Sequence, residues 1–417
     1  MFDYKNFDGS LQKRFMKYVQ VDTQSDPESP TCPSTEKQKT LGRILVDELL
    51  EMGLNDAEMD DNGYAYATIP STTEKQVPVI CFCSHMDTSP DCSGQNVKPI
   101  IHDNYQGEDL ILPDDPKIVL KMAEHRDLKQ QIGNSIITAS GTTLLGADNK
   151  AGVAEIMEAA RFLVSNPQIK HGTIKIFFTP DEEIGRGVDK ADLKKLSADF
   201  AYTIDGETLG SIEDETFSAD GAVLVIDGVS THPGFAKGKM QSAIKILCEI
   251  IDLLPKETLT PEVTHQKQGF IHPVSIKGQV EQAEAHFIIR DFTDEKLEEH
   301  GKLLESTVKT VMAKFTESSY TLEIKAQYRN MKQILDQHPQ VVQYGIEAIE
   351  RAGVVAKQQS IRGGTDGSRL SFMGLPCPNI FAGEHAFHSK QEWVSVQDME
   401  KAVQTIVNIA CIWEERA

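Results

Sequence analysis

Short apolar runs alternate with stretches of helical periodicity along most of the chain. Four apolar runs predict strands: 77–83, 172–180, 199–206 and 377–383. Two stretches with apolar residues at helical spacing predict helices: 149–165 and 396–415. Two further helices and a hairpin turning at Asn62-Gly63 are expected nearer the N-terminus: 11–21, 39–53 and 57–70. This alternation predicts an α/β fold with a mixed, mostly parallel sheet covered by helices.

The pattern changes between residues 214 and 329. Strand patterns here are 222–229, 270–278, 284–292 and 320–328, and helical patterns are 236–255 and 294–315. Their order is β-α-β-β-α-β, which is typical of a ferredoxin-like α+β domain. We therefore expect an inserted domain at 214–329, within a larger domain made of 1–213 and 330–417.

Charge and cysteine content narrow the class of protein. The 417 residues carry a net charge of −21, which argues against nucleic acid or an anionic membrane as a partner. No apolar run approaches the ~18 residues of a membrane span. Residues 1–10 lack the basic and apolar regions of a signal peptide. Seven cysteines without a Cys-x-x-Cys pair indicate reduced thiols and a cytoplasmic protein.

Acidic residues and a histidine follow the predicted strands at their carboxyl ends. The sequence FFTPDEEIGRG, at 177–187, sets Asp181, Glu182 and Glu183 side by side after one strand. The other groups at this edge are His85 and Asp87 after the run 77–83, Asp205 near the end of 199–206, and Asp148 just before a helix. Ligands of open α/β sheets bind outside the carboxyl ends of the strands. Each residue alone is an ordinary turn, cap or solvated group, but together they predict one site.

A pair of divalent metal ions explains why these groups gather. Zinc binds imidazole nitrogen and carboxylate oxygen, and two ions ~3.5–4 Å apart need a bridging carboxylate. The positive charge of two zinc ions would be balanced by three carboxylates and a hydroxide. Two neutral histidines would be the remaining ligands. One of the two adjacent glutamates, Glu182 or Glu183, could bind metal while the other lies over the bound water. The second histidine is expected after a late strand, where both His385 and His388 occur.

Five blocks in this order resemble the metal site of the di-zinc exopeptidase family that includes carboxypeptidase G and the Xaa-His dipeptidases. They are SHMDTS, GADNKAG, PDEEIG, IDG and a late HS. The resemblance implies the following roles: His85 and Asp205 on one zinc, Glu183 and His388 on the other, Asp148 bridging, Glu182 as general base and Asp87 orienting His85. It leaves His385 without a role. Co²⁺ or Mn²⁺ could replace the two Zn²⁺ ions of each subunit.

The resemblance to one branch of this family, which acts on tripeptides, is carried by three further blocks: VSTHPGFAKGKMQSA, FIIRDF and IRGGTDGSRLSFMGLPCPN. The resemblance places His232, in VSTHPG, over the scissile carbonyl, although His-Pro-Gly is also an ordinary turn. Arg290 and Arg362 suit the carboxylate end of a short peptide, although Arg290 could instead pair with Asp291 or Asp294. The implied activity is tripeptide aminopeptidase. The alternatives are a dipeptidase, carboxypeptidase or N-acyl amino acid deacylase of the same family, or a metal-free binding protein. The resemblance also implies that the inserted domain, 214–329, is a lid on the catalytic domain of 1–213 and 330–417, and that a homodimer forms through this lid domain.

Overall fold

The chain divides into two compact units. The computed structural model describes residues 9–417. Most of residues 1–10, which are not expected to be a signal peptide, therefore lies outside the described residues. The first unit takes in residues up to Asp214 together with 333–359 and 365–417, and the second consists of 215–332 and 360–364. The expected lid domain, by comparison, runs from 214 to 329. Within residues 9–417, no helix is long and apolar enough to span a membrane.

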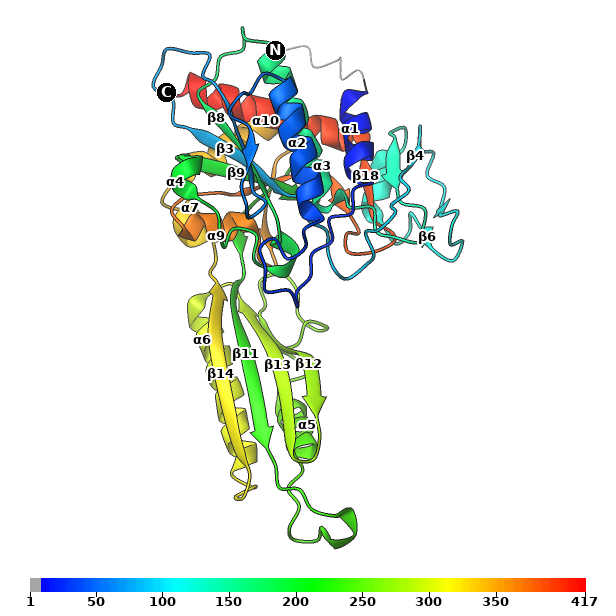
Figure 1. Cartoon of the computed structure of the whole chain (residues 1–417), viewed down its shortest axis with the longest axis vertical. Helices are drawn as coiled ribbons and strands as arrows, with labels where there is room; N and C mark the ends of the chain where they lie inside the picture. Colours follow the sequence, from blue (N-terminus) through cyan, green and yellow to red (C-terminus); the bar gives the residue numbers. More distant parts are fainter. Residues whose placement is uncertain (1–8) are drawn as a thin grey trace. The chain divides into compact units, whose positions relative to one another are not determined.

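An eight-stranded mixed sheet organises the first unit (Figure 1). Its strands, in spatial order, are β1 (Glu58–Met59), β2 (Ala65–Ile69), β8 (Ile174–Thr179), β3 (Ile80–His85), β9 (Phe200–Gly206), β16 (Asn379–Phe381), β10 (Ser211–Thr216) and β15 (Lys357–Ile361). The central strands β8, β3, β9 and β16 run parallel. Strand β2 is antiparallel to β1 and β8, and β10 is antiparallel to β16. The predicted α/β architecture is therefore confirmed, and strands β10 and β15 are additions to it.

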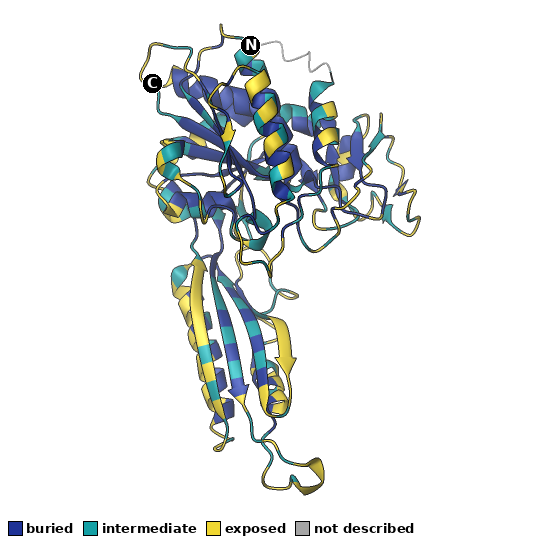
Figure 2. Cartoon of the chain, viewed as in Figure 1, coloured by how far each residue is buried: buried dark blue, intermediate teal, exposed yellow. Residues whose placement is uncertain are grey.

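Helices cover both faces of this sheet, which is why its central strands are apolar without alternation. Helix α3 (Ala147–Ser165) packs on β3 and β9 and is backed by α10 (Val396–Glu415). On the other face, α4 (Leu193–Leu196) and α9 (Asp366–Phe372) share a core cluster with β3 and β8. The remaining helices are α1 (Ser10–Tyr18), α2 (Gln38–Glu51), α7 (Lys332–Leu335) and α8 (Pro339–Arg351). Every residue of β3 is buried, and Figure 2 shows the same for much of the sheet's centre.

A small antiparallel sheet carries a loop that is important for the site. Its order is β17 (Glu384–His385), β18 (Trp393–Ser395), β7 (Ile136–Thr138) and β4 (Ile100–His102). A hairpin of β5 (Leu110–Ile111) and β6 (Val119–Leu120) and a 3₁₀ turn, η1 (Arg126–Gln131), complete this part of the chain. Strands of two or three residues are too short to show periodicity, so the sequence pattern did not predict them.

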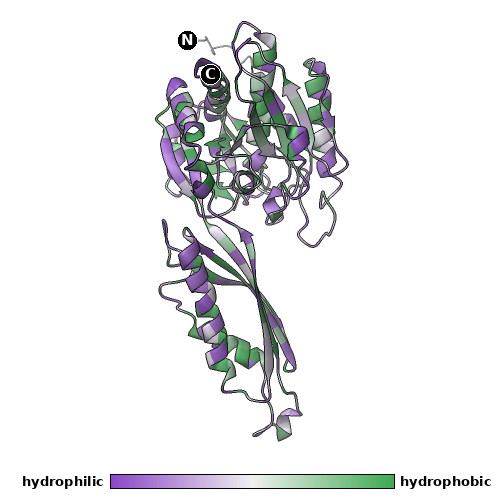
Figure 3. Cartoon of the chain, turned by 90° about the vertical axis from the view of Figure 1, so that its left-hand side faces the viewer, coloured by the Kyte–Doolittle hydropathy of each residue, from purple (hydrophilic) through white to green (hydrophobic). Residues whose placement is uncertain are grey.

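The second unit has the predicted ferredoxin-like order. Its elements are β11 (Ser218–Asp227), α5 (Ala243–Leu253), β12 (Phe270–Gly278), β13 (Gln282–Asp291), α6 (Asp294–Met312) and β14 (Ser319–Tyr328). The antiparallel sheet has the order β12-β13-β11-β14, and one face of it packs on both helices. Helix α6 carries hydrophilic and hydrophobic residues together (Figure 3), as expected of a helix with one buried face.

The largest difference from a predicted helix boundary is at the start of α5. The helix expected over 236–255 begins only at Ala243, with Ser242 at its N-cap. The preceding residues form a loop that contains a 3₁₀ turn, η3 (Pro233–Phe235), and Gly238 at φ 72°. A left-handed glycine ends helical geometry, so the apolar spacing here extends further than the helix does.

Candidate metal centre

The structure brings the predicted metal ligands together at one edge of the large sheet. His85 is the last residue of β3, and Asp205 is the last but one of β9. Glu182 and Glu183 lie in the 3₁₀ turn η2 (Glu182–Ile184), which follows β8. Asp148 lies in the first turn of α3, where its backbone is not helical. The carboxyl ends of parallel strands thus define the site, as the sequence predicted.

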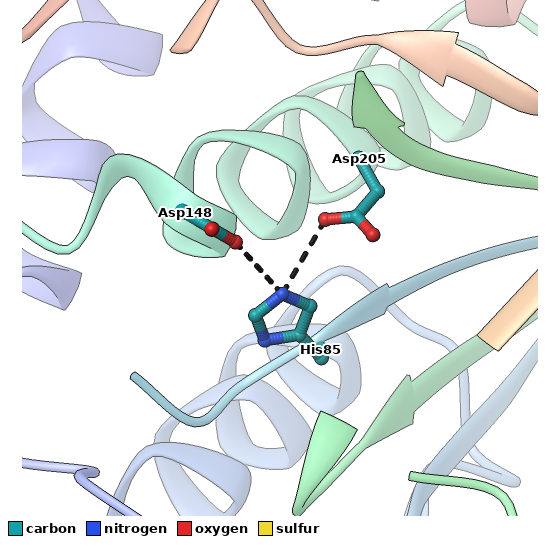
Figure 4. Close-up of side chains that lie close together, drawn as sticks. All are labelled: His85, Asp148 and Asp205. Carbon is teal, nitrogen blue, oxygen red and sulfur yellow. Dashed lines mark hydrogen bonds and ion pairs between the residues drawn. The ribbon is translucent and has the colours of Figure 1, made fainter. Parts of the chain in front are cut away.

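His85, Asp148 and Asp205 form the first donor group (Figure 4). Nε2 of His85 lies 2.9 Å from Oδ1 of Asp148 and 3.4 Å from Oδ1 of Asp205. Nδ1 of His85 lies 3.1 Å from the backbone oxygen of Asp87 and 3.4 Å from Oδ1 of that residue. With its proton on Nδ1, His85 donates to Asp87 and keeps the Nε2 lone pair free for a metal ion.

Asp148, Glu183 and His388 form the second donor group. Nε2 of His388 lies 2.8 Å from Oε2 of Glu183 and 3.2 Å from Oδ2 of Asp148. Asp148 therefore directs Oδ1 to the first group and Oδ2 to the second, which is the disposition of a bridging carboxylate. His388 has φ 59°, a left-handed conformation that costs energy for a residue with a Cβ and is often found at functional sites.

The electrostatics of the two groups fit divalent cations. Burial raises the pKa of Glu183 to about 8, and the charge of Asp148 adds to the effect. Burial works to lower the pKa of His388, but hydrogen bonds to Asp148 and Glu183 outweigh it and raise the pKa to about 11. Oε1 of Glu183 is buried without a hydrogen-bond partner among the described residues. Nitrogen and carboxylate donors with such excess negative charge match the ligands that zinc prefers.

The three adjacent acids of 181–183 have different surroundings. Asp181 has φ 60° and is buried away from both donor groups, where it accepts hydrogen bonds from the backbone N–H of Ser34 and from Nε2 of Gln38, each at 2.7 Å. The N–H groups of Glu182 and Glu183 donate to the two carboxylate oxygens of Asp87, at 3.0 and 3.2 Å. Burial raises the pKa of Glu182 well above its usual range. Asp87 thus holds both the turn η2 and the imidazole of His85.

The predicted substrate contacts lie in the second unit. Nδ1 of His232 accepts a hydrogen bond from the N–H of Gly234 at 3.2 Å, as in an ordinary turn. Nη1 of Arg290 donates to the backbone oxygens of Asp220 and Ile289, at 3.1 and 2.9 Å. These contacts do not test a substrate role, so both roles stay predictions.

Arg362 lies within the stretch expected to be catalytic domain, yet residues 360–364 belong to the second unit. Its guanidinium carbon lies 5.0 Å from the ring centre of Phe217, and Nη1 donates to the backbone oxygens of Gln266 and Gln268. Nη2 also donates to Thr264, at 3.1 Å. These contacts explain the assignment of this short stretch, and several donors of Arg362 are used within its own unit.

Sequence reasoning overlooked two buried acids beside the donor groups and left His385 unassigned. Glu392 accepts hydrogen bonds from the segment that carries Asp148, and Asp366 accepts one from Thr179 at 2.6 Å. The sequence did contain a signal for both acids, because Glu392 and Asp366 are the single charged residues in the blocks QEWVS and GGTDGS. His385 lies outside both donor groups, with its ring stacked on Trp393 at 4.1 Å.

Comparison with known proteins agrees with this geometry. The family model for Peptidase family M20/M25/M40 matches residues 143–411. Peptidase T of Caldanaerobacter subterraneus subsp. tengcongensis is 47% identical over 404 residues, which cover 97% of this chain and 98% of that protein. The crystal structure of aminopeptidase PepT from Bacillus cereus ATCC 10987 superposes with a TM-score of 0.75 at 24% identity, covering 99% of each chain. The YXEP protein of Bacillus subtilis, a dinuclear metal-binding peptidase of the M20 family, gives a TM-score of 0.66 at 16% identity, with 99% of this chain and 100% of that one covered. The likeness to these two solved structures, at 24% and 16% identity, shows the fold alone.

Proposed function

Because the chain belongs to peptidase family M20/M25/M40, we propose that it is a two-metal aminopeptidase that releases the N-terminal residue from tripeptides. Full-length identity of 47% to a protein named Peptidase T supports the choice of substrate within this family of hydrolases. The intact donor groups argue against a metal-free binding protein. The same fold could serve a dipeptidase, carboxypeptidase or N-acyl amino acid deacylase, which are the alternatives that substrate tests must separate.

The observation that carries the proposal is the position of Asp148. Its two oxygens face two different donor groups, each with one histidine and one further carboxylate. We infer that His85 and Asp205 hold one ion and Glu183 and His388 the other. Zinc is the ion that this donor set favours, and Co²⁺ or Mn²⁺ are alternatives.

Glu182 is the proposed general base. A metal pair bound here would polarise the scissile carbonyl and lower the pKa of a coordinated water. Glu182 takes a proton from the attacking water and returns it to the departing amine. Its raised pKa suits both steps, because a carboxylate that is too weakly basic would not hold the proton long enough to deliver it. Asp87 keeps both residues in place, because its carboxylate accepts from the N–H of Glu182 and its backbone oxygen accepts from Nδ1 of His85.

The remaining proposals concern substrate, assembly and compartment. We expect Arg290 and Arg362 to bind the C-terminal carboxylate of the peptide and His232 to contact the scissile carbonyl. A homodimer through the second unit is supported by the edge strand β12, whose residues 274–278 are exposed. All seven cysteines are free thiols, which supports a cytoplasmic location.

The test is the pattern of cleavage by the purified, zinc-loaded chain. We expect free N-terminal amino acid and dipeptide from a tripeptide, and no product from the same tripeptide acetylated at its N-terminus. Release of the C-terminal residue would indicate a carboxypeptidase, cleavage of dipeptides alone a dipeptidase, and cleavage of N-acyl amino acids a deacylase. Elemental analysis of the same sample should give two zinc ions per chain.

A further inference from the structure

The carboxylate of Glu392 is bound by three backbone N–H groups from the segment that leads to Asp148. Oε2 accepts from the N–H groups of Leu145 and Gly146, each at 2.7 Å, and Oε1 accepts from the N–H of Asp148 at 3.0 Å. Glu392 is buried, with 1% of its surface exposed. Three charge-assisted hydrogen bonds to one buried carboxylate form a rigid connection.

Glu392 lies in the loop between β17 and β18 that also carries His388. This loop is ordered by contacts of its own: Oγ of Ser389 donates to the backbone oxygen of Ala386 at 2.6 Å, and Nε2 of Gln391 donates to that of Val119 at 2.8 Å. Only three residues lie between His388 and Glu392. The carboxylate therefore connects the loop that presents His388 to the segment that presents Asp148.

A second anchor holds the other side of the same segment. Nδ2 of Asn149 donates to Oγ of Ser84 at 3.0 Å and to the backbone oxygen of Ile204 at 2.8 Å. Ser84 precedes His85 on β3, and Ile204 precedes Asp205 on β9. Asn149 thus fixes Asp148 relative to the first donor group, whereas Glu392 fixes it relative to His388.

We propose that Glu392 is a positioning residue that sets the geometry of the second donor group, Asp148, Glu183 and His388. This proposal rests on the two-metal function proposed above. It adds to the site a residue, Glu392, that would contact neither ion. Without this carboxylate, three N–H groups would be left unsatisfied, and the distance between Asp148 and His388 would no longer be fixed. The first donor group would keep its anchor at Asn149.

The informative substitution is Glu392→Gln. The amide keeps the size of the side chain, but its NH₂ must meet a backbone N–H on whichever side it lies, because both carboxylate oxygens are used. We expect the second zinc ion to bind about 10- to 100-fold more weakly, the range found when groups behind a metal ligand are changed. The first ion should bind as in the unmodified chain, and activity should return when free zinc is raised.

The experiment uses full-length chains loaded with zinc and dialysed at a series of buffered free-zinc concentrations. Zinc per chain is measured by elemental analysis, and the melting temperature of each zinc-free chain is measured in parallel. Glu392→Asp keeps the charge on a shorter side chain and should weaken the second ion less. Glu155→Gln is the matched control, because Glu155 is fully buried on α3 and its carboxylate makes no hydrogen bond to another described residue.

Selective weakening of one zinc ion in Glu392→Gln, with a zinc-free melting temperature near that of the control, would support the proposal. If Glu392→Gln binds each of the two zinc ions as tightly as the unmodified chain does, the proposal is wrong. It is also wrong if both Glu392 variants fail to fold, since the residue would then support the fold rather than the site. An unmodified chain that holds two zinc ions but leaves tripeptides intact would refute the proposed activity alone.

Discussion

Replacing Glu182 by glutamine should remove turnover and leave the metal centre in place. Among the described residues, the side chain of Glu182 makes no hydrogen bond, and its backbone N–H to Asp87 is unaffected by the change. The amide has the same size but cannot take a proton. Loss of a general base costs about 10²- to 10⁴-fold in rate. At 1.36 kcal/mol per tenfold, this corresponds to about 2.7–5.4 kcal/mol of transition-state stabilisation.

The assay follows free N-terminal amino acid released from a tripeptide by chromatography, with zinc content measured on the same samples. For Glu182→Gln we expect kcat to fall while the chain retains two zinc ions. Glu183→Gln is the matched control one residue along, and it should lose zinc from the second donor group first. A Glu182→Gln chain with full zinc and unchanged kcat would refute the role of Glu182. Loss of zinc from that variant would show that Glu182 is a ligand instead.

Four other outcomes are expected. Asp148→Ala should lower affinity for both zinc ions, as elemental analysis would show, because each of its oxygens faces one donor group. Removal of metal by a chelator should abolish tripeptide cleavage, and added zinc should restore it; full activity in excess chelator would contradict the two-metal mechanism. Asp181→Asn should lower the free energy of unfolding by about 1.5–3 kcal/mol for each weakened hydrogen bond, measured by denaturant titration, with little change in kcat. A tripeptide amide should be cleaved with kcat/KM roughly 10- to 150-fold below that of the free acid, and Arg290→Ala or Arg362→Ala should remove this difference.

The ligands at strand ends were predictable because the rule behind them is general. A continuous apolar run predicts a buried strand, and parallel strands have their carboxyl ends at one edge. That rule alone places His85, Glu183 and Asp205 near one another. Asp148 needed only its position before a helix. The chemistry of the donor set then follows from the residue types.

Other features depend on information that the hydrophobic pattern does not contain. Strand β10 reads as polar because it includes Glu213 and Asp214, both buried, so the pattern gave no signal for it. His388 lies between two strands too short to show periodicity, so choosing it over His385 required the family resemblance. Three adjacent acids cannot be told apart by residue type. In the structure Asp181 differs from its neighbours because it has a positive φ and its carboxylate is bound by Ser34 and Gln38.

The order of the strands has a consequence for the chain while it is being synthesised. Strand β16, from Asn379 to Phe381, lies inside the large sheet between β9 and β10, and His388 follows it. A nascent polypeptide that has passed Thr216 already contains the first donor group and both β9 and β10. It still lacks β16, which lies between those two strands, and it lacks His388 of the second donor group. Complete hydrolytic machinery therefore exists only after a late segment has been inserted between strands made long before. Fragments released early from the ribosome would be unable to cleave peptides.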